Sequence, residues 1–249
     1  MSAIEYLERV EETIGEIRVH ETDKIEKAAR LMADSITSGH LVHLFGSGHS
    51  VIPVMDVFPR YGSFVGFHPL LDPRLMWCNV VGPGGARELL WLERQEGYVA
   101  NFLQSFEFHP QDTMWVFSHG GLNAAPVEAA LYARERGLPV VAVVSGENHR
   151  KAKPTHSSGK KLGDLADVMI DTHVPLEDAL VRIDGFNIPV AAGSTVAAVA
   201  ISCAIVGEVA KLLVAAGVRP STFVSPNVQG VGPDHNRNVF VEYAERVRR

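Results

Sequence analysis

The chain is poor in cysteine, and we expect no signal peptide from the pattern of its first residues. Only two of its 249 residues are cysteines, Cys78 and Cys203, and they lie far apart in the sequence without a Cys-x-x-Cys pair. This usage excludes a disulfide framework and suits a reducing cytosol. The acidic amphipathic run over residues 4–17 has no signal-peptide core, so we expect a cytoplasmic protein.

Large basic patches and clustered metal ligands are also missing. The formal net charge is −6, with 23 Lys and Arg against 29 Asp and Glu, which argues against a nucleic-acid partner or an anionic membrane surface. The 11 histidines are too dispersed to define a metal site by spacing, and no motif demands a cofactor. We therefore predict no bound metal and no cofactor, although dispersed histidines do not exclude a metal.

No linker, charge block or internal repeat divides the sequence. With 46% hydrophobic and 21% charged residues the chain can bury a full core, which predicts one domain over residues 1–249. Within it we expect a helical segment at 1–38 and a C-terminal tail at 218–249. The apolar run 194–216 is long enough to span a membrane, but two charged residues lie far inside it, which favours a buried helix.

Alternating patterns predict the fold class. Apolar runs predict strands at 41–45, 64–67, 113–117, 139–144 and 167–171. Helical patterns cover 3–19, 22–38, 50–59, 86–106, 124–136, 194–216 and 236–248. The alternation indicates a three-layer α/β fold, a doubly wound and mostly parallel sheet of about five strands between helices. The Pro- and Gly-rich loop over 68–85 is long for a compact domain, and we interpret it as a lid or substrate loop.

A polar turn follows the first strand and opens the next helix. It consists of Gly46, Ser47, Gly48, His49 and Ser50. Such a turn exposes N–H groups and hydroxyls at the positive end of the helix dipole, where anions bind. The turn lacks the third glycine of the Rossmann fingerprint and the lysine of a P-loop, so neither nucleotide motif is satisfied. Tight turns of this composition also occur for structural reasons alone.

A second polar turn follows the strand at 113–117. It contains Ser118, His119, Gly120, Gly121 and Asn123. The carboxyl ends of parallel strands share one edge of a sheet, and small ligands bind there near the point where strand order reverses. We therefore predict that the two turns together form one anion site.

With these turns, the strand at 139–144 and the Leu-Gly-Asp-Leu-Ala-Asp-Val pattern within 160–171, the chain resembles the sugar isomerase (SIS) domain family, over roughly residues 25–215. It is most similar to phosphoheptose isomerase-like members with a single domain. The resemblance implies a sugar-phosphate ligand and a homodimer or homotetramer. The second turn departs from the family pattern Ser-x-Ser-Gly-x-Ser/Thr, because Gly120 and Asn123 stand at the second and third hydroxyl positions. Phosphate recognition is therefore weaker than in a typical member, and the anion is a phosphate or, less often, a sulfonate.

Proton transfer requires a base in addition to an anion anchor. If residues 86–106 form one helix, Glu96 falls in its apolar stripe and Glu93 at the margin of that stripe. A carboxylate in apolar surroundings has a raised pKa, which suits proton abstraction near neutral pH. An ion pair between helices or between subunits explains either glutamate equally well.

Three histidines compete for the second proton-transfer role. His49 and His119 lie in the two turns, where either can also bind hydroxyls or the anion without transferring a proton. His235 lies in a glycine-rich C-terminal segment, and in several SIS enzymes such a segment completes the site, sometimes across subunits. All three remain candidates.

The resemblance implies an aldose–ketose isomerase that acts on a phosphorylated sugar through a cis-enediol(ate). Two alternatives stay open. A non-catalytic sugar-phosphate sensor needs the turns but no base. A lyase or etherase uses the same first proton abstraction and then eliminates a substituent beta to the carbonyl.

Overall fold

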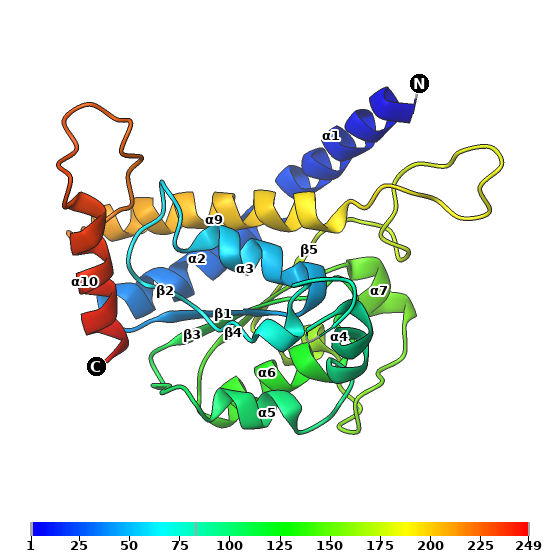
Figure 1. The fold of residues 1–249 in the computed structure, drawn as a ribbon, viewed down its shortest axis with the longest axis horizontal. Helices are drawn as coiled ribbons and strands as arrows, with labels where there is room; N and C mark the ends of the chain where they lie inside the picture. Colours follow the sequence, from blue (N-terminus) through cyan, green and yellow to red (C-terminus); the bar gives the residue numbers. More distant parts are fainter. Residues whose placement is uncertain (1, 83, 249) are drawn as a thin grey trace.

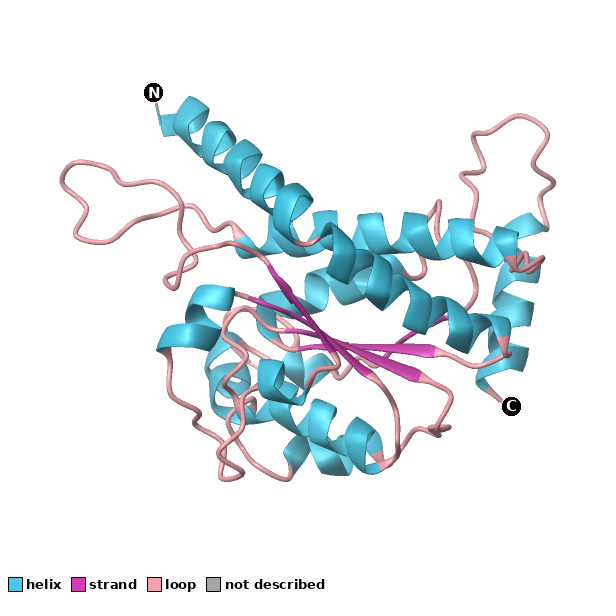
Figure 2. Cartoon of the chain, turned by 180° about the vertical axis from the view of Figure 1, so that it is seen from behind, coloured by secondary structure: helices cyan, strands magenta, loops and turns pink. Residues whose placement is uncertain are grey.

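The computed structural model describes residues 2–82 and 84–248, in which a parallel sheet lies between two layers of helices (Figures 1 and 2). All four strand pairings are parallel. The strands, in the order β2-β1-β3-β4-β5, are β1 (Val42–Gly46), β2 (Phe67–Pro69), β3 (Thr113–Phe117), β4 (Val140–Val144) and β5 (Val168–Asp171). They are almost fully buried, because helices cover both faces of the sheet. The predicted three-layer α/β fold is confirmed.

One face of the sheet carries the helices drawn above it and at its left end in Figure 1. They are α1 (Ser2–His20), α2 (Thr22–Thr37), α3 (Val51–Val57), α9 (Ser194–Ala215) and α10 (His235–Val247). α1 packs on this side only through its C-terminal part. Trp115 and Phe117 of β3 belong to the core on this side, whereas Met114 and Val116 belong to the core on the other side. This alternation follows from the two-residue repeat of a strand.

The opposite face is covered by α5 (Tyr98–Leu103), α6 (Ala124–Glu135) and α8 (Leu162–Leu165). α6 is rich in alanine, a strong helix former, and ends before Gly137, which has a φ of +80°. Two further helices, α4 (Ala86–Leu92) and α7 (Gly146–Lys151), lie near the carboxyl ends of the strands (Figure 1).

The prediction of one helix over 86–106 is wrong. The chain turns between α4 and α5, where Gly97 has a φ of +86° that favours glycine. The carboxylate of Glu128, in the middle of α6, accepts hydrogen bonds from the backbone N–H groups of Gly97, Val99 (3.1 Å) and Ala100 (3.3 Å). A side chain distant in sequence therefore caps α5 and ends the continuous helix that the local pattern indicates.

Smaller differences lie on either side of the sheet. The second strand lies at 67–69 rather than 64–67, because Phe64 forms an antiparallel bridge with Thr222 of the C-terminal segment instead. Between the strands predicted at 139–144 and 167–171, where no helix was predicted, the structure has α7 and α8, and the loop over 68–85 contains a short 3₁₀ turn, Pro73–Leu75.

The apolar run at 194–216 forms α9, which packs on α2 and α3. Its inward face consists of Ala197, Ile201, Ile205, Val209 and Leu213. α9 is the one helix in the described part of the chain that is long and apolar enough to cross a membrane, a property that core helices of soluble proteins share. Val196 and Val214 remain exposed on its outer side.

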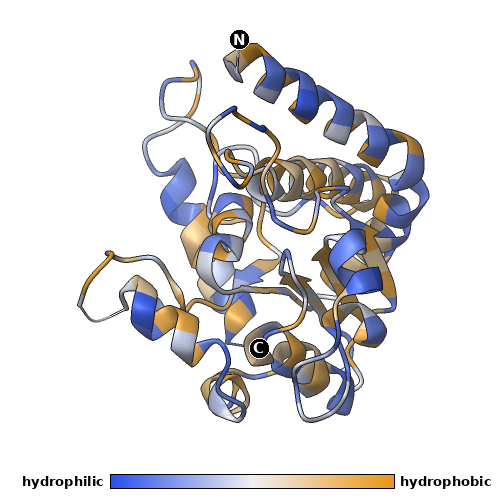
Figure 3. Ribbon diagram, turned by 90° about the vertical axis from the view of Figure 1, so that its right-hand side faces the viewer, coloured by the Kyte–Doolittle hydropathy of each residue, from blue (hydrophilic) through white to orange (hydrophobic). Residues whose placement is uncertain are grey.

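The N-terminal helix α1 extends away from the body of the molecule (Figure 1). Ile17, near its end, is its one buried residue in the described structure, whereas Ile4 and Leu7 are exposed. Along α1 hydrophilic and hydrophobic turns alternate, as Figure 3 shows at the top right. Part of its apolar stripe is therefore left uncovered.

Candidate functional site

Glycine allows the first turn to close tightly after β1. A Cβ at Gly46 would lie 2.2 Å from the carbonyl oxygen of Ser50, so no other residue fits there without a shift of the backbone. Gly48 has a φ of +60°, and Gly48–Ser50 form a short 3₁₀ turn before α3. The sequence at this turn thus places Ser47, His49 and Ser50 at the carboxyl edge of the sheet.

The second turn lies beside the first, because β1 and β3 are neighbours in the sheet. The backbone N–H of Ser118 donates to the carbonyl oxygen of Val143 (3.0 Å), and the N–H of Gly121 donates to Ser118 Oγ (3.1 Å). Gly121 has a φ of +65°. The structure therefore brings the two predicted turns together.

A small polar hollow lies between these turns, the end of β5 and the start of α9. Its hydroxyl groups come from Ser50, Ser118, Thr172, Ser194 and Thr195. Its imidazoles come from His49 and His119, and its apolar lining from Pro53, Phe117, Val143 and Ala198. The other predicted ligand-binding residues, Gly46, Ser47, Gly48, Gly120, Gly121 and Asn123, belong to the turns around it. Across residues 2–82 and 84–248, no group of three His, Cys, Asp or Glu side chains is arranged to hold a metal ion.

Sequence reasoning missed Thr172, Ser194 and Thr195, which supply hydroxyls that the second turn lacks. The Ser-Thr pair at the start of α9 suggests helix capping, but the carboxylate of Asp178 performs that role. It accepts the N–H of Gly193 (3.2 Å), the N–H of Ser194 (2.7 Å) and the hydroxyl of Ser194 (2.6 Å). Because Asp178 takes the first two N–H groups of α9, an anion in the hollow depends on hydroxyls more than on this helix terminus.

His119 has one ring nitrogen free for a ligand. Its Nε2 lies 3.2 Å from the carbonyl oxygen of Leu176 and 3.1 Å from Asn148 Nδ2. Its Nδ1 is buried and has no hydrogen-bond partner in the described structure. Buried polar atoms are normally paired, so this unpaired nitrogen on a residue that lines the hollow makes His119 a candidate for contact with a ligand.

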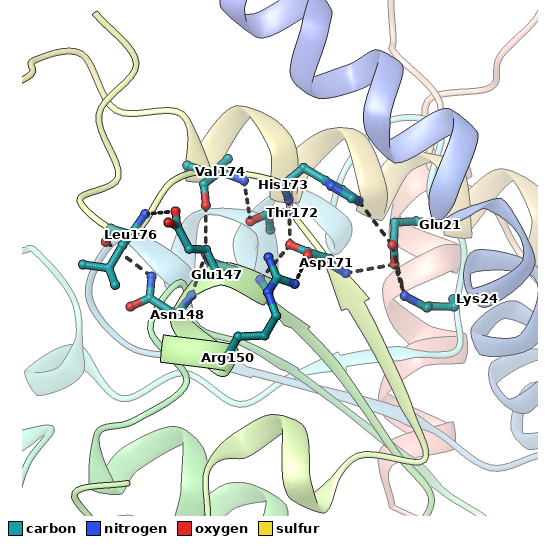
Figure 4. Close-up of polar contacts among 12 residues, drawn as sticks. Glu21, Lys24, Glu147, Asn148, Arg150, Asp171, Thr172, His173, Val174 and Leu176 are labelled. Atoms are coloured by element: carbon teal, nitrogen blue, oxygen red, sulfur yellow. Dashed lines mark hydrogen bonds and ion pairs between the residues drawn. The ribbon is translucent and has the colours of Figure 1, made fainter. Parts of the chain in front are cut away.

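The segment after β5 is held in place by a polar network (Figure 4). Ser145 Oγ donates to the carbonyl oxygen of Val174 (2.8 Å), and the N–H of Leu176 donates to the carboxylate of Glu147 (2.9 Å). Asn148 Nδ2 donates to the carbonyl oxygen of Leu176 (3.3 Å). These contacts fix the carbonyl group that orients His119.

Buried carboxylates anchor the same segment on its other side. Asp171 Oδ1 accepts the N–H groups of Gly146 (2.7 Å) and His173 (2.8 Å). Glu21, between α1 and α2, accepts the N–H of Asp171 (3.0 Å) and pairs with Lys24 (2.8 Å) and His173 Nε2 (3.2 Å), as Figure 4 shows. The N-terminal helices therefore help to position Thr172 in the hollow.

Glu93 is buried beside the first turn. It lies directly after α4, which ends at Leu92 instead of continuing to residue 106 as predicted. The residue is 8% exposed, and Ser47 Oγ donates to its Oε2 (2.9 Å). Burial raises the pKa of the Glu93 carboxyl, and the bond from Ser47 and the charge of Arg94, 3.9 Å away, offset part of that effect. A raised pKa suits a general base.

Glu96 differs from Glu93, and its predicted place in an apolar stripe is wrong. It is exposed in the turn between α4 and α5, because the helix ends before it. Its carboxylate accepts the N–H of Ser157 (2.7 Å) and the Ser157 hydroxyl, and these bonds lower its pKa. His156 Nε2 lies 3.7 Å away.

His235 lies outside this cluster. It begins α10, at the end of the molecule opposite α4 and α7 (Figure 1), and its Nε2 lies 2.8 Å from the carbonyl oxygen of Thr222. Within one chain the structure therefore brings His49 and His119 to the hollow, and His235 stays apart.

These features define a doubly wound α/β protein with a polar small-ligand site at the carboxyl edge of its sheet. The chain belongs to the SIS domain family, whose model matches residues 5–145. The UPF0309 protein of Geobacillus kaustophilus is 33% identical over 243 residues, which are 98% of this chain and 94% of that protein. A solved phosphoheptose isomerase from Francisella tularensis is similar with a TM-score of 0.55 and 15% identity, over 83% of this chain and 95% of the other. A solved phosphoheptose isomerase from Neisseria gonorrhoeae is similar with a TM-score of 0.54 and 14% identity, over 83% of this chain and 96% of the other.

Proposed function

We propose that this chain is a sugar-phosphate aldose–ketose isomerase that acts through a cis-enediol(ate). One observation carries the proposal: the hollow at the carboxyl edge gathers five hydroxyls and two imidazoles from four separate segments. Membership of the SIS family and the fold shared with phosphoheptose isomerases support a sugar phosphate as the ligand.

The phosphate group would occupy the hollow. The Ser194 hydroxyl already donates to Asp178, which leaves the hydroxyls of Ser50, Ser118, Thr172 and Thr195 to donate to phosphate oxygens. Each bond to a charged group contributes about 1.5–3 kcal/mol. None of the described residues that line the hollow is lysine or arginine. Recognition of the phosphate would therefore depend on the geometry of the hydroxyls and on the dipoles of the turns. A sulfonate could bind to the same donors.

Glu93 is the proposed base. Ser47 holds its carboxylate against the first turn, so a sugar that extends from the hollow past this turn would bring its carbonyl end toward Glu93. The carboxylate takes the proton from the carbon alpha to the carbonyl, and the electron pair of that C–H bond forms the enediol(ate). The same carboxyl group, whose proton can exchange with the solvent, then delivers a proton to the neighbouring carbon. His119 Nδ1 would move the proton between the two oxygens.

The test is a thermal-shift screen of pentose, hexose and heptose phosphates and sulfonated sugars. It is followed by proton NMR of each stabilising compound in D₂O with the protein. An isomerase incorporates deuterium from the solvent at the carbon beside the carbonyl and forms the isomeric sugar. Binding without exchange would indicate the sensor instead, and loss of a beta substituent would indicate the lyase. Failure of every compound to bind would overturn the anion site itself.

We further propose that the protein works in the cytoplasm as a homodimer or homotetramer, with a small molecule rather than nucleic acid or a membrane as its partner. The net charge of −6 supports the absence of a nucleic-acid partner. The exposed apolar residues of α1 and α9 support contact with another copy.

A further inference from the structure

Trp77 lies beside the first turn, in the loop that the sequence suggested as a lid or substrate loop. Its ring centroid is 5.0 Å from that of His49, with an angle of 34° between the ring planes. Its Nε1 lies 3.2 Å from the point where a side chain at Gly48 would place its Cβ. The indole thus occupies space that the missing side chain of Gly48 leaves free.

The indole of Trp77 is neither buried nor fully paired. The residue is 37% exposed, and its Nε1 has no hydrogen-bond acceptor among residues 2–82 and 84–248. Of the other two tryptophans, Trp115 is buried in the core and Trp91 is exposed on α4. A partly exposed indole beside a polar hollow presents both an apolar ring face and an N–H group to a ligand.

We propose that Trp77 is a specificity-determining residue that contacts the sugar part of the ligand. This inference rests on the proposed function. His49 lines the hollow and Trp77 packs against His49, so the indole extends the wall of the site from the phosphate position toward the first turn. The exposed ring covers the apolar C–H face of a cyclic sugar, and the free N–H donates to a sugar hydroxyl.

The chemistry of the ligand follows from this placement. A phosphate that carries a sugar ring would use both the hollow and the indole, whereas inorganic phosphate and glycerol 3-phosphate would use the hollow alone. The site therefore selects ring-bearing phosphates over short ones. Aromatic contacts of this kind are strong enough to change affinity severalfold to about tenfold.

The test compares Trp77→Ala, Trp77→Phe and the control Trp91→Ala with the wild-type protein by calorimetry. The probes are inorganic phosphate, glycerol 3-phosphate and the sugar phosphate that binds the wild-type protein most tightly. We expect Trp77→Ala to raise the Kd of the sugar phosphate about tenfold and to leave the Kd of both short probes within about twofold. Trp77→Phe keeps an aromatic ring face and loses the N–H, so its Kd for the sugar phosphate should lie between those of the wild-type protein and Trp77→Ala. Trp91→Ala should change none of them.

Intrinsic fluorescence gives a second readout. The sugar phosphate should change the emission of the wild-type protein and of Trp91→Ala, and this change should be lost in Trp77→Phe. An equal Kd for the sugar phosphate in wild type and Trp77→Ala would overturn the inference and leave the proposed function standing. An equal loss for all three probes would also overturn it, because Trp77 would then act through the shape of the turn. No binding of any probe to the wild-type protein would overturn both proposals.

Discussion

Replacement of Glu93 by glutamine should reduce turnover and stabilise the protein at the same time. The amide keeps the shape of the side chain and still accepts the hydrogen bond from Ser47, but it cannot take a proton. A general base contributes about 10²–10⁴-fold to a rate, so exchange of the substrate proton should fall by that factor while substrate affinity changes little.

The stability effect follows from the raised pKa of Glu93. Because its pKa in the folded state lies above its unfolded value of about 4.5, its contribution to stability is fully present below pH 4.5 and is lost as the pH rises through the folded pKa. Glutamine has no such loss. Each pKa unit corresponds to about 1.4 kcal/mol, or roughly 3–6 °C in melting temperature for a domain of this size. The Tm advantage of Glu93→Gln should therefore be small near pH 4, grow as the pH rises and become constant above the folded pKa.

The assay measures melting temperature from pH 4 to pH 8 together with deuterium incorporation into the sugar phosphate. Glu96→Gln is the matched control, because Glu96 is exposed and lies three residues along the same segment. It should keep most of the exchange rate. A Glu93→Gln protein that melts below wild type at pH 7 would show that the charge of Glu93 supports the fold. Normal exchange in that variant would remove Glu93 as the base and leave His119 as the strongest remaining candidate.

Three further predictions concern the site and the assembly. Ser50→Ala and Ser118→Ala should each weaken sugar-phosphate binding about ten- to hundredfold in calorimetry with an unchanged circular dichroism spectrum, and unchanged affinity would move the anion elsewhere. Gly46→Ala should lower both the Tm and the affinity for the sugar phosphate, because its Cβ would clash with the Ser50 carbonyl oxygen. The control Gly15→Ala in α1, where no atom lies within 4 Å of the added Cβ, should raise the free energy of unfolding by about 0.5–1 kcal/mol. Equal Tm values for Gly46→Ala and the wild-type protein would contradict the clash. In sedimentation without detergent the protein should be a dimer or larger, since α9 is apolar and partly uncovered, and a monodisperse monomer would refute this.

Local pattern was sufficient for elements that are bounded by strong turn signals, although their partners lie far along the chain. β3 lies at the predicted residues 113–117, β1, β4 and β5 lie within one residue of prediction, and α9 ends one residue early. Each is an apolar run between strong turn signals, so the apolar residues and the flanking turn residues indicate the same bounds for the element. The two Gly-rich turns could be placed at one edge because parallel strands impose that geometry.

The glutamates could not be ranked from sequence, because a distant residue decides where the helix ends. The apolar spacing continues through residues 86–106, since Val99 and Leu103 pack in the same core that α6 lines. The break depends on Glu128, whose carboxylate caps α5 from another helix. A helical-wheel argument assumes one continuous helix, so it assigned Glu96 to the core and Glu93 to its margin, and the structure reverses that order.

The hydroxyls of the hollow come partly from beyond the residues that the family model matches. The family model matches residues 5–145 and so includes both turns, but Thr172, Ser194 and Thr195 lie beyond it. Where the second turn has Gly120 and Asn123 in place of hydroxyl residues, these three side chains approach the same hollow from the end of β5 and the start of α9. Their positions depend on the segment after β5, which Glu21, Asp171 and the α7 residues hold by hydrogen bonds. If the phosphate binds here, its affinity depends on the two turns and also on hydroxyls beyond the residues that the family model matches, so the choice of ligand can change in that later part while the two turns stay the same.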